Sequence, residues 1–196
     1  MATNPRDVPQ HYYSLDEYFA LEGASDARFE YWDGEIICMS GGSRAHYRIS
    51  SNVILALGLG LRGGPCQAFT GDAAIWTPTL PPYRYPDASA VCGELQYKHI
   101  NGLDAIVSPT LIIEVTSPST IRRDEGEKFV AYQAVPTLRE YLLVSQDERR
   151  VTHYTRASGG AWERRDVTDA DASLELESVG CPLKMRDIYE GVTFSG

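Results

Sequence analysis

Apolar and polar positions follow two different periods along the chain, and each period predicts one kind of element. Apolar residues recur at helical spacing from about residue 44 to residue 61, where Ile49, Val53 and Leu57 share one face of a helix. Short β-branched runs between turn-forming residues predict strands instead. We expect such strands at residues 66–76, 87–91, 110–115 and 138–145. The run at 110–115 has no polar alternation, which is typical of a central strand buried on both faces.

Capping and turn residues predict further elements toward both ends of the chain. Ser14 and Glu17 match the capping-box pattern and predict a short helix that ends at Gly23. Asp33-Gly34 between two apolar runs is a strong signal for a β-hairpin. The same kinds of signal predict a polar loop at 93–108, a helix at about 121–134, a hairpin closed at Gly159-Gly160, and a short helix near 184–189 at the edge of the fold.

The order of these elements predicts an α/β fold in which helices flank a mixed β-sheet. A chain of 196 residues suits one domain with a substantial core. We expect a flexible N-terminal tail at residues 1–12 and a single domain at residues 13–196. No apolar run approaches the roughly 20 residues of a membrane helix, and the N-terminus lacks the hydrophobic core of a signal peptide. We therefore expect a soluble, cytoplasmic protein with no membrane partner.

The charge balance limits how the chain can meet nucleic acid. Lys and Arg number 18 against 27 Asp and Glu, so the formal net charge is -9. This excess of acids opposes broad, non-specific attraction to nucleic acid. Any such binding has to use one local basic groove, or metal ions that offset the acids.

The spacing of the cysteines matches no functional motif. Cys38, Cys66, Cys92 and Cys181 lie far apart, without a CxxC pair or a zinc-ligand cluster. We expect them to be small buried hydrophobes in a reducing compartment.

Two acidic residues stand out because they adjoin apolar, β-branched runs. Asp87 follows Pro86 at the start of one predicted strand, and Glu114 lies inside the run Leu111 to Val115. Neither run could bury an unpaired carboxylate cheaply. Two carboxylates on neighbouring strands would make an oxygen-rich site for a divalent cation, and such a site supports hydrolysis of a phosphate ester.

Lys128 lies on the face of the helix at 121–134 that meets the sheet, together with Ile121 and Tyr132. Two interpretations stay open from spacing alone. The side chain can reach solvent at the edge or pair with Asp124 at i,i+4 spacing. Alternatively, it can point over the end of the sheet toward Glu114.

Several short segments together carry a resemblance to a known family. They are Phe29-Glu30, Asp33 to Ile36, His46, Tyr85 to Ala88, Pro109 to Thr120, Asp124 with Lys128 and Tyr132, and Glu140 to Val144. As a set they resemble the Uma-type family of putative bacterial restriction endonucleases, within the PD-(D/E)XK nuclease superfamily. The resemblance covers well over half of the chain and implies a restriction-endonuclease-like fold.

The resemblance also implies roles for the acidic residues. Asp87 and Glu114 would both bind Mg²⁺, or Mn²⁺ in its place, together with the backbone carbonyl of Val115. Glu30 would be an extra acid near the metal. The superfamily's usual lysine would fall at position 116, where this chain has Thr116. Lys128 matches the family's alternative lysine on the following helix, where it would orient or help deprotonate the attacking water and offset charge in the transition state.

Five further residues are candidates for outer positions of the site. His46 can contact a phosphate or the outer shell of the metal, and Arg44 and Arg48 beside it can line a DNA groove. A solvent-exposed helix face explains most such arginines. Ser117 and Asp124 can hydrogen-bond near the metal, although a turn or cap role fits Ser117 better.

The leading hypothesis is a Mg²⁺-dependent endonuclease that acts on DNA, as a homodimer by analogy with nucleases that cut duplexes. The alternative is a catalytically silent nuclease-fold module for binding or assembly, which the net charge and Thr116 favour. A third option is a metal-dependent hydrolase of a smaller phosphate substrate.

Overall fold

The structure is a computed structural model that describes residues 11–39 and 41–194. Contacts between residues group the chain into two compact units, 1–41 and 42–196, and each unit is described by itself. Residues 1–10 of the expected tail lie outside the described residues. The expectation of one domain over 13–196 stays a prediction.

The N-terminal unit forms the elements that its capping and turn residues predict. It contains α1 (Leu15–Gly23) and a hairpin of β1 (Phe29–Trp32) and β2 (Glu35–Cys38). Ser14 Oγ accepts a hydrogen bond from the backbone N–H of Glu17, whose carboxylate accepts one from the backbone N–H of Ser14. At the hairpin turn both central residues have positive φ, 43° and 87°, as a type I′ turn requires.

The larger unit contains a six-stranded sheet in the order β12-β11-β10-β9-β6-β3. Its strands are β3 (Cys66–Thr70), β6 (Ala88–Cys92), β9 (Leu111–Thr116), β10 (Glu140–Ser145), β11 (Val151–Arg156) and β12 (Trp162–Val167). β9 and β10 are parallel and all other neighbours are antiparallel, so the sheet is mixed, as predicted. All six residues of β9 are buried, which confirms that this strand is central.

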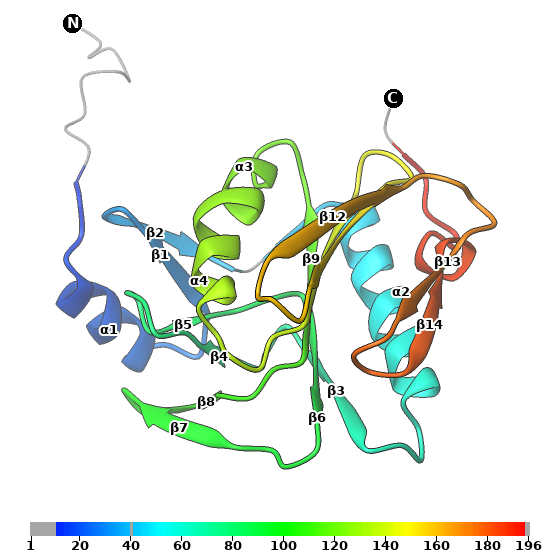
Figure 1. Cartoon of the computed structure of the whole chain (residues 1–196). Helices are drawn as coiled ribbons and strands as arrows, with labels where there is room; N and C mark the ends of the chain where they lie inside the picture. The colour runs from blue at the N-terminus through cyan, green and yellow to red at the C-terminus, as the bar shows by residue number, and fades with distance from the viewer. Residues whose placement is uncertain (1–10, 40, 195–196) are drawn as a thin grey trace, which may run out of the picture. The chain divides into compact units, whose positions relative to one another are not determined.

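Helices cover both faces of this sheet (Figure 1). One face carries α2 (Arg44–Gly60), which packs its buried residues against Ile113 and Val115 of β9. The other face carries a helical segment made of α3 (Ile121–Arg123), the π-helical η2 (Asp124–Lys128) and α4 (Phe129–Gln133), with a kink at Gly126. No helix among the described residues is long and apolar enough to cross a membrane.

The single strand predicted at 66–76 is wrong, because the chain turns after Thr70. Gly71 lies so close to the backbone at Pro86 that an added Cβ would be 3.2 Å from the Pro86 carbonyl oxygen. The chain continues as β4 (Ile75–Trp76), which belongs to a second sheet in the order β5-β4-β8-β7.

The polar loop predicted at 93–108 is also wrong, because this segment forms most of the second sheet. β7 (Tyr97–Ile100) and β8 (Leu103–Ile106) pair as an antiparallel hairpin, and β5 (Tyr83–Arg84) adds an edge strand. The turn residues Asn101 and Gly102 have φ of 49° and 87°. Most side chains of β7 are exposed, so its polar sequence hides a strand.

The C-terminal segment belongs to the core on the α2 side. A hairpin of β13 (Ser173–Leu176) and β14 (Cys181–Lys184) precedes the short helix α5 (Met185–Ile188). Met185 and Ile188 are fully buried in the same cluster as the inward face of α2. The helix predicted near 184–189 is present, but it packs against α2 and not at the edge of the fold.

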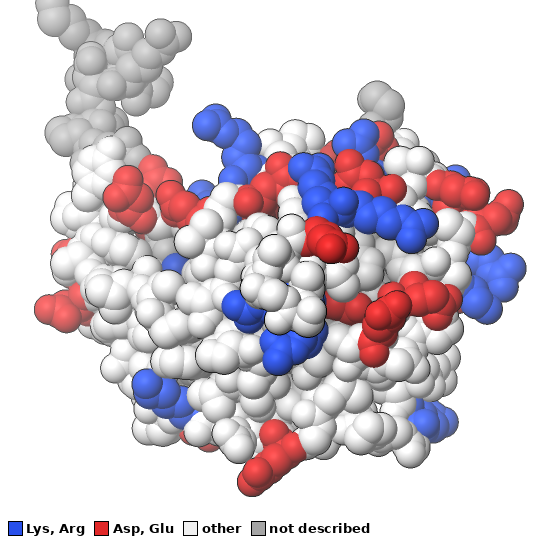
Figure 2. Space-filling model, in the orientation of Figure 1, with Lys and Arg blue, Asp and Glu red and all other residues white. Residues whose placement is uncertain are grey.

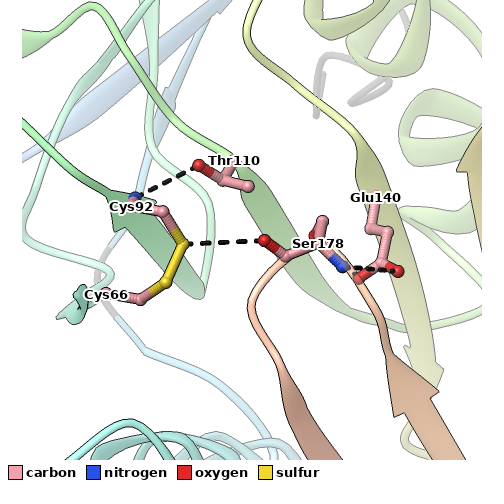
Figure 3. Close-up of a disulfide and its surroundings, with 5 residues drawn as sticks. All are labelled: Cys66, Cys92, Thr110, Glu140 and Ser178. Carbon is pink, nitrogen blue, oxygen red and sulfur yellow. Dashed lines mark hydrogen bonds between the residues drawn. A yellow bond between two sulfur atoms is a disulfide. The ribbon is translucent and has the colours of Figure 1, made fainter. Parts of the chain in front are cut away.

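Two of the four cysteines form a disulfide, which corrects the expectation that all are free. Cys66 of the edge strand β3 faces Cys92 of β6, and their sulfur atoms are bonded (Figure 3). The Cys92 backbone N–H donates a hydrogen bond to Thr110 Oγ1, and the Cys92 sulfur lies 3.7 Å from the Ser178 carbonyl oxygen. Cys38 lies outside this disulfide and is exposed, and Cys181 is a free, buried thiol. Sequence spacing missed the pair because only the register of β3 on β6 brings the two residues together.

Candidate active site

Asp87 and Glu114 come from neighbouring strands of the large sheet. β6 and β9 are antiparallel, and Ala88 faces Ile113. Asp87 directly precedes Ala88, and Glu114 directly follows Ile113. The two acidic residues therefore occupy opposed positions at the end of this strand pair.

Both carboxylate oxygens of Asp87 accept hydrogen bonds from other elements. The backbone N–H of Val115 donates to Oδ2 over 2.7 Å. Nε2 of His46, near the start of α2, lies 3.1 Å from Oδ1. The side chains of His46 and Asp87 are 26% and 23% exposed, so solvent reaches both. The bond from Val115 fixes the Asp87 carboxylate beside Glu114.

Glu114 and Lys128 form a buried ion pair. Nζ of Lys128 lies 2.9 Å from each of the two carboxylate oxygens, and the two side chains are only 4% and 3% exposed. The hydroxyl of Tyr132 donates to Oε1 of Glu114 over 3.1 Å. These contacts supply the compensation that a buried charge requires.

Lys128 also connects the two acidic residues through the backbone. Its Nζ donates to the carbonyl oxygen of Tyr85 over 3.2 Å, and Tyr85 is two residues before Asp87. The contact with Glu114, one of the interpretations that spacing left open for Lys128, is therefore present. Lys128 as a whole residue is only 2% exposed, so its side chain does not extend into solvent.

His46 lies in the electric field of the other site residues. Its hydrogen bond to Asp87 raises the pKa of the imidazole above the usual value, and burial lowers it. The negative charges of Asp87 and Asp124 raise this pKa further, whereas the positive charge of Lys128 lowers it. The charges of Asp87, Asp124 and Lys128 therefore all act on His46 within this site.

One helical segment, kinked at Gly126, supplies three groups at the site. Lys128 and Tyr132 are four residues apart, which places both on one face. Asp124, four residues earlier, is 5% exposed, and its carbonyl oxygen accepts a hydrogen bond of 3.0 Å from the hydroxyl of Tyr141 in β10. That bond ties the η2 segment to the sheet.

The remaining predicted residues lie in less central positions. Ser117 is engaged in its own turn, because its Oγ accepts from the Thr120 backbone N–H and contacts Ser119 Oγ. Arg44 is the exposed first residue of α2, and Arg48 donates from Nε to the carbonyl oxygen of Glu190. Arg44 and Arg48 both line a surface pocket beside the N-terminus of α2.

The roles of two predicted metal ligands, Glu30 and the Val115 carbonyl oxygen, stay predictions. Glu30 lies in the N-terminal unit, where its carboxylate accepts a hydrogen bond of 3.2 Å from Trp32 Nε1. Val115 contributes its N–H to Asp87, and a role for its carbonyl oxygen stays a prediction.

The carboxylates at this edge of the sheet are the type of ligand that binds a magnesium ion. Mg²⁺ is usually held by one or two carboxylates and keeps several waters, and Asp87 and Glu114 supply two carboxylates at one edge. Among the described residues, no group of three or more His, Cys, Asp or Glu side chains could hold a metal ion. A cation at this edge would therefore depend on water and backbone oxygen for its other ligands.

Tyr132 is the functional candidate that sequence reasoning left without a role. It was placed on the same helix face as Lys128, but its contact with Glu114 could not be read from spacing. Thr116, at the position of the usual lysine, is 3% exposed and offers no cation.

The mixed sheet flanked by helices places the chain in the class of α/β proteins. A family model described as "Uma2: Putative restriction endonuclease" matches residues 15–184, and the chain belongs to this family. The fold class and the family predicted from sequence are both confirmed.

Individual relatives agree with this assignment. The chain is 34% identical over 181 residues to the uncharacterized protein slr1290 of Synechocystis, which covers 92% of this chain and 93% of that protein. It is 31% identical over 160 residues to the uncharacterized protein sll1609 of the same organism, covering 82% and 90%. A crystal structure from Anabaena variabilis, described as a putative nuclease belonging to DUF820, superposes with a TM-score of 0.71 at 19% identity, covering 92% of this chain and 99% of that one.

Proposed function

We propose that this protein is a metal-dependent endonuclease that hydrolyses phosphodiester bonds of DNA. The convergence of Asp87, Glu114 and Lys128 carries the proposal. Asp87 is tied to the backbone beside Glu114, and Lys128 is tied both to Glu114 and to the backbone near Asp87. Membership of a restriction endonuclease family supports a nuclease on independent grounds.

In this proposal Asp87 and Glu114 hold Mg²⁺, for which Mn²⁺ can substitute, with the Val115 carbonyl oxygen and water. When bound, the ion lowers the pKa of a bound water and stabilises the extra negative charge on phosphorus. Glu30 of the N-terminal unit is proposed as an additional acidic ligand.

The chain's own residues orient the carboxylates and balance charge. Lys128 donates to Glu114 and Tyr85 at once, so what it supplies is fixed positive charge beside the reacting phosphate. His46 holds the more exposed carboxylate, that of Asp87, through Oδ1. Arg44 and Arg48 at the start of α2 are proposed to contact backbone phosphates.

The surface charge suggests how DNA would be held. On the face seen in Figure 2, basic side chains lie scattered among acidic ones, in keeping with the net charge of -9. DNA binding by the proposed enzyme is therefore local and depends on the metal. We also propose that it acts in the cytoplasm as a homodimer, with one active site for each strand; sedimentation that shows only monomer at working concentration would remove the dimer.

Plasmid cleavage with and without Mg²⁺ tests the proposal, alongside calorimetric titration of Mg²⁺. Asp87→Asn and Glu114→Gln keep side-chain size and should lower cleavage by at least about a hundredfold. Asp104→Asn is the matched control, because Asp104 is an exposed acid paired with His99 in the β7–β8 hairpin. A purified, folded protein that binds no divalent ion would refute the proposal at its first step.

One observation favours the alternative of a catalytically silent module. Thr116 replaces the usual lysine, and Lys128 is bound in a buried pair with Glu114. A silent module would fold and bind its partner without metal-dependent cleavage, and loss of the Lys128 charge would change only stability. Cleavage of nucleotides but not of DNA would instead indicate a hydrolase of small phosphates.

A further inference from the structure

A cavity of about 380 Å³ opens beside Glu114, at the carboxyl ends of the parallel strands β9 and β10. Leu143 lines this β9–β10 cavity and is the register partner of Glu114 in the adjacent strand. Thr116 also lines it and lies two residues after Glu114, on the same face of β9. Neighbouring strands are about 4.8 Å apart, so the backbone of the lining residue Leu143 lies one strand spacing from that of Glu114.

The floor of the cavity is firm and of mixed polarity. Thr116, Leu143 and Thr152 are exposed by only 3%, 2% and 4%, so the sheet holds them in place. Ser145 contributes another hydroxyl, and Ile121 contributes an apolar wall from the start of the helical segment. An apolar surface edged by hydroxyl groups suits a flat ring that carries hydrogen-bonding groups on its edge.

The charged groups at the rim are largely paired with one another. Arg150 lies 3.0 Å from Glu148, and Arg164 lies 3.4 Å from Glu125. Asp147 adds a third carboxylate. Because acids outnumber arginines here and both arginines are already in ion pairs, this rim disfavours a phosphate. It favours an uncharged ligand that offers N–H donors to carboxylates.

We infer that the β9–β10 cavity binds the nucleobase of the nucleotide next to the scissile phosphate. This inference rests on the proposed function, because that phosphate has to lie at Asp87 and Glu114. A nucleobase offers a flat apolar face and an edge of donors and acceptors. Enzymes that take a base out of the stack hold it in a pocket of this kind. The cavity's volume lies within the roughly 300–1,000 Å³ of small-ligand sites. The exocyclic amino groups of adenine, cytosine and guanine are the donors that its carboxylates would accept from.

Binding of free nucleosides to the full-length protein tests the inference without any cleavage assay. Adenosine, cytidine, guanosine and thymidine are titrated, followed by tryptophan fluorescence and calorimetry. Ser145→Phe fills the cavity from β10 and should raise the dissociation constant of the amino-bearing nucleosides at least about tenfold. Ser158→Phe makes the same change in a separate surface hollow of about 360 Å³ and should leave binding unchanged. Ile121→Trp fills the cavity from the helix side, in case Ser145→Phe does not fold.

Two outcomes overturn the inference. One is the absence of nucleoside binding to the wild-type protein up to about 10 mM; the other is binding that both filled variants retain. An oligonucleotide library cleaved by wild-type protein should show a base preference beside the cut, which Ser145→Phe reduces. If no DNA is cut but nucleosides bind and Ser145→Phe abolishes that binding, the proposed function fails and the cavity's ligand class stands. If DNA is cut with the same base profile by both proteins, the cavity inference fails and the proposed function stands.

Discussion

The hydroxyl of Tyr132 donates a 3.1 Å hydrogen bond to the Glu114 carboxylate from a position with no solvent exposure. The same carboxylate oxygen lies 2.9 Å from Lys128 Nζ. Two donors from successive turns of one helical segment therefore determine how the Glu114 carboxylate is oriented. Orientation of a ligand by such outer contacts typically changes metal affinity ten- to a hundredfold.

Tyr132→Phe should weaken Mg²⁺ binding by about tenfold while the fold is retained. The phenyl ring keeps the packing of Tyr132 against Tyr141, and only the hydroxyl is lost. Cleavage rates measured against Mg²⁺ concentration should show a raised requirement for the metal and recovery near saturation. Tyr189→Phe is the control, since its hydroxyl bonds to backbone groups at Ser145 and Arg150, away from Glu114 in the sequence. An unchanged Mg²⁺ requirement in Tyr132→Phe would restrict Tyr132 to a structural role.

Lys128→Met should destabilise the protein by about 3–5 kcal/mol, because it leaves the buried Glu114 carboxylate without its cation. The double variant Lys128→Met with Glu114→Gln removes both charges and should recover most of this loss. The free energies of unfolding in urea for the wild-type protein, both single variants and the double variant give the coupling energy of the pair. Coupling near zero would contradict the geometry of a tight ion pair.

Cleavage separates the catalytic role of Lys128 from its structural one. In the proposed enzyme the double variant should be stable and inactive, because both a metal ligand and the fixed positive charge are gone. Stability that recovers together with cleavage would remove both residues from the mechanism.

Two hairpins show where local sequence suffices to predict structure and where it does not. Asp33-Gly34 and Asn101-Gly102 both have positive φ at their central residues. The first was predicted because apolar runs flank it. The second was missed because its flanking strand, β7, is mostly exposed and carries polar residues, so no apolar alternation marks it. The turn signal at Asn101-Gly102 alone was therefore not enough to predict a hairpin in a segment of polar composition.

The candidate site divides in the same way between local and long-range information. Asp87, Glu114 and Lys128 could be chosen from sequence because acidic and basic groups in apolar runs need partners. His46 of α2 could be named as a candidate, but its contact with Asp87 could not be predicted. Sequence separation does not say which helix start meets which strand end. The Cys66–Cys92 disulfide and the Tyr132 contact needed the strand register and the helix's position on the sheet.

Reduction of the Cys66–Cys92 disulfide should lower the free energy of unfolding by about 3 kcal/mol, through the freedom that the unfolded chain regains. The bond links residues 26 apart and ties the edge strand β3 to β6. Urea unfolding with and without dithiothreitol measures this effect. The double variant Cys66→Ala with Cys92→Ala should lose the dependence on dithiothreitol, whereas Cys38→Ser, at an exposed cysteine outside the disulfide, should keep it. Equal stability in both redox states would show that the bond is not formed in solution.

Tyr189 should make the protein less stable at alkaline pH. Burial raises the pKa of its phenol well above the usual 10.0, and the hydroxyl donates to the carbonyl oxygens of Ser145 and Arg150. The folded-state pKa exceeds the unfolded value, so the stabilisation is complete below about pH 10. It is lost as pH rises from the unfolded pKa toward the folded one, because the unfolded chain releases its proton first.

Tyr189→Phe cannot ionise and should remove up to about 1.4 kcal/mol per pH unit from the slope of unfolding free energy above pH 10. At pH 7 the same variant should be less stable by about 1 kcal/mol, since it loses part-buried hydrogen bonds to the backbone of Ser145 and Arg150. Tyr154, whose pKa burial also raises, leaves a residual slope. Urea unfolding between pH 7 and pH 11 checks both expectations, with Tyr97→Phe at an exposed tyrosine as the control. A slope that Tyr189→Phe leaves as steep as that of the wild-type protein would assign the alkaline loss of stability to other groups.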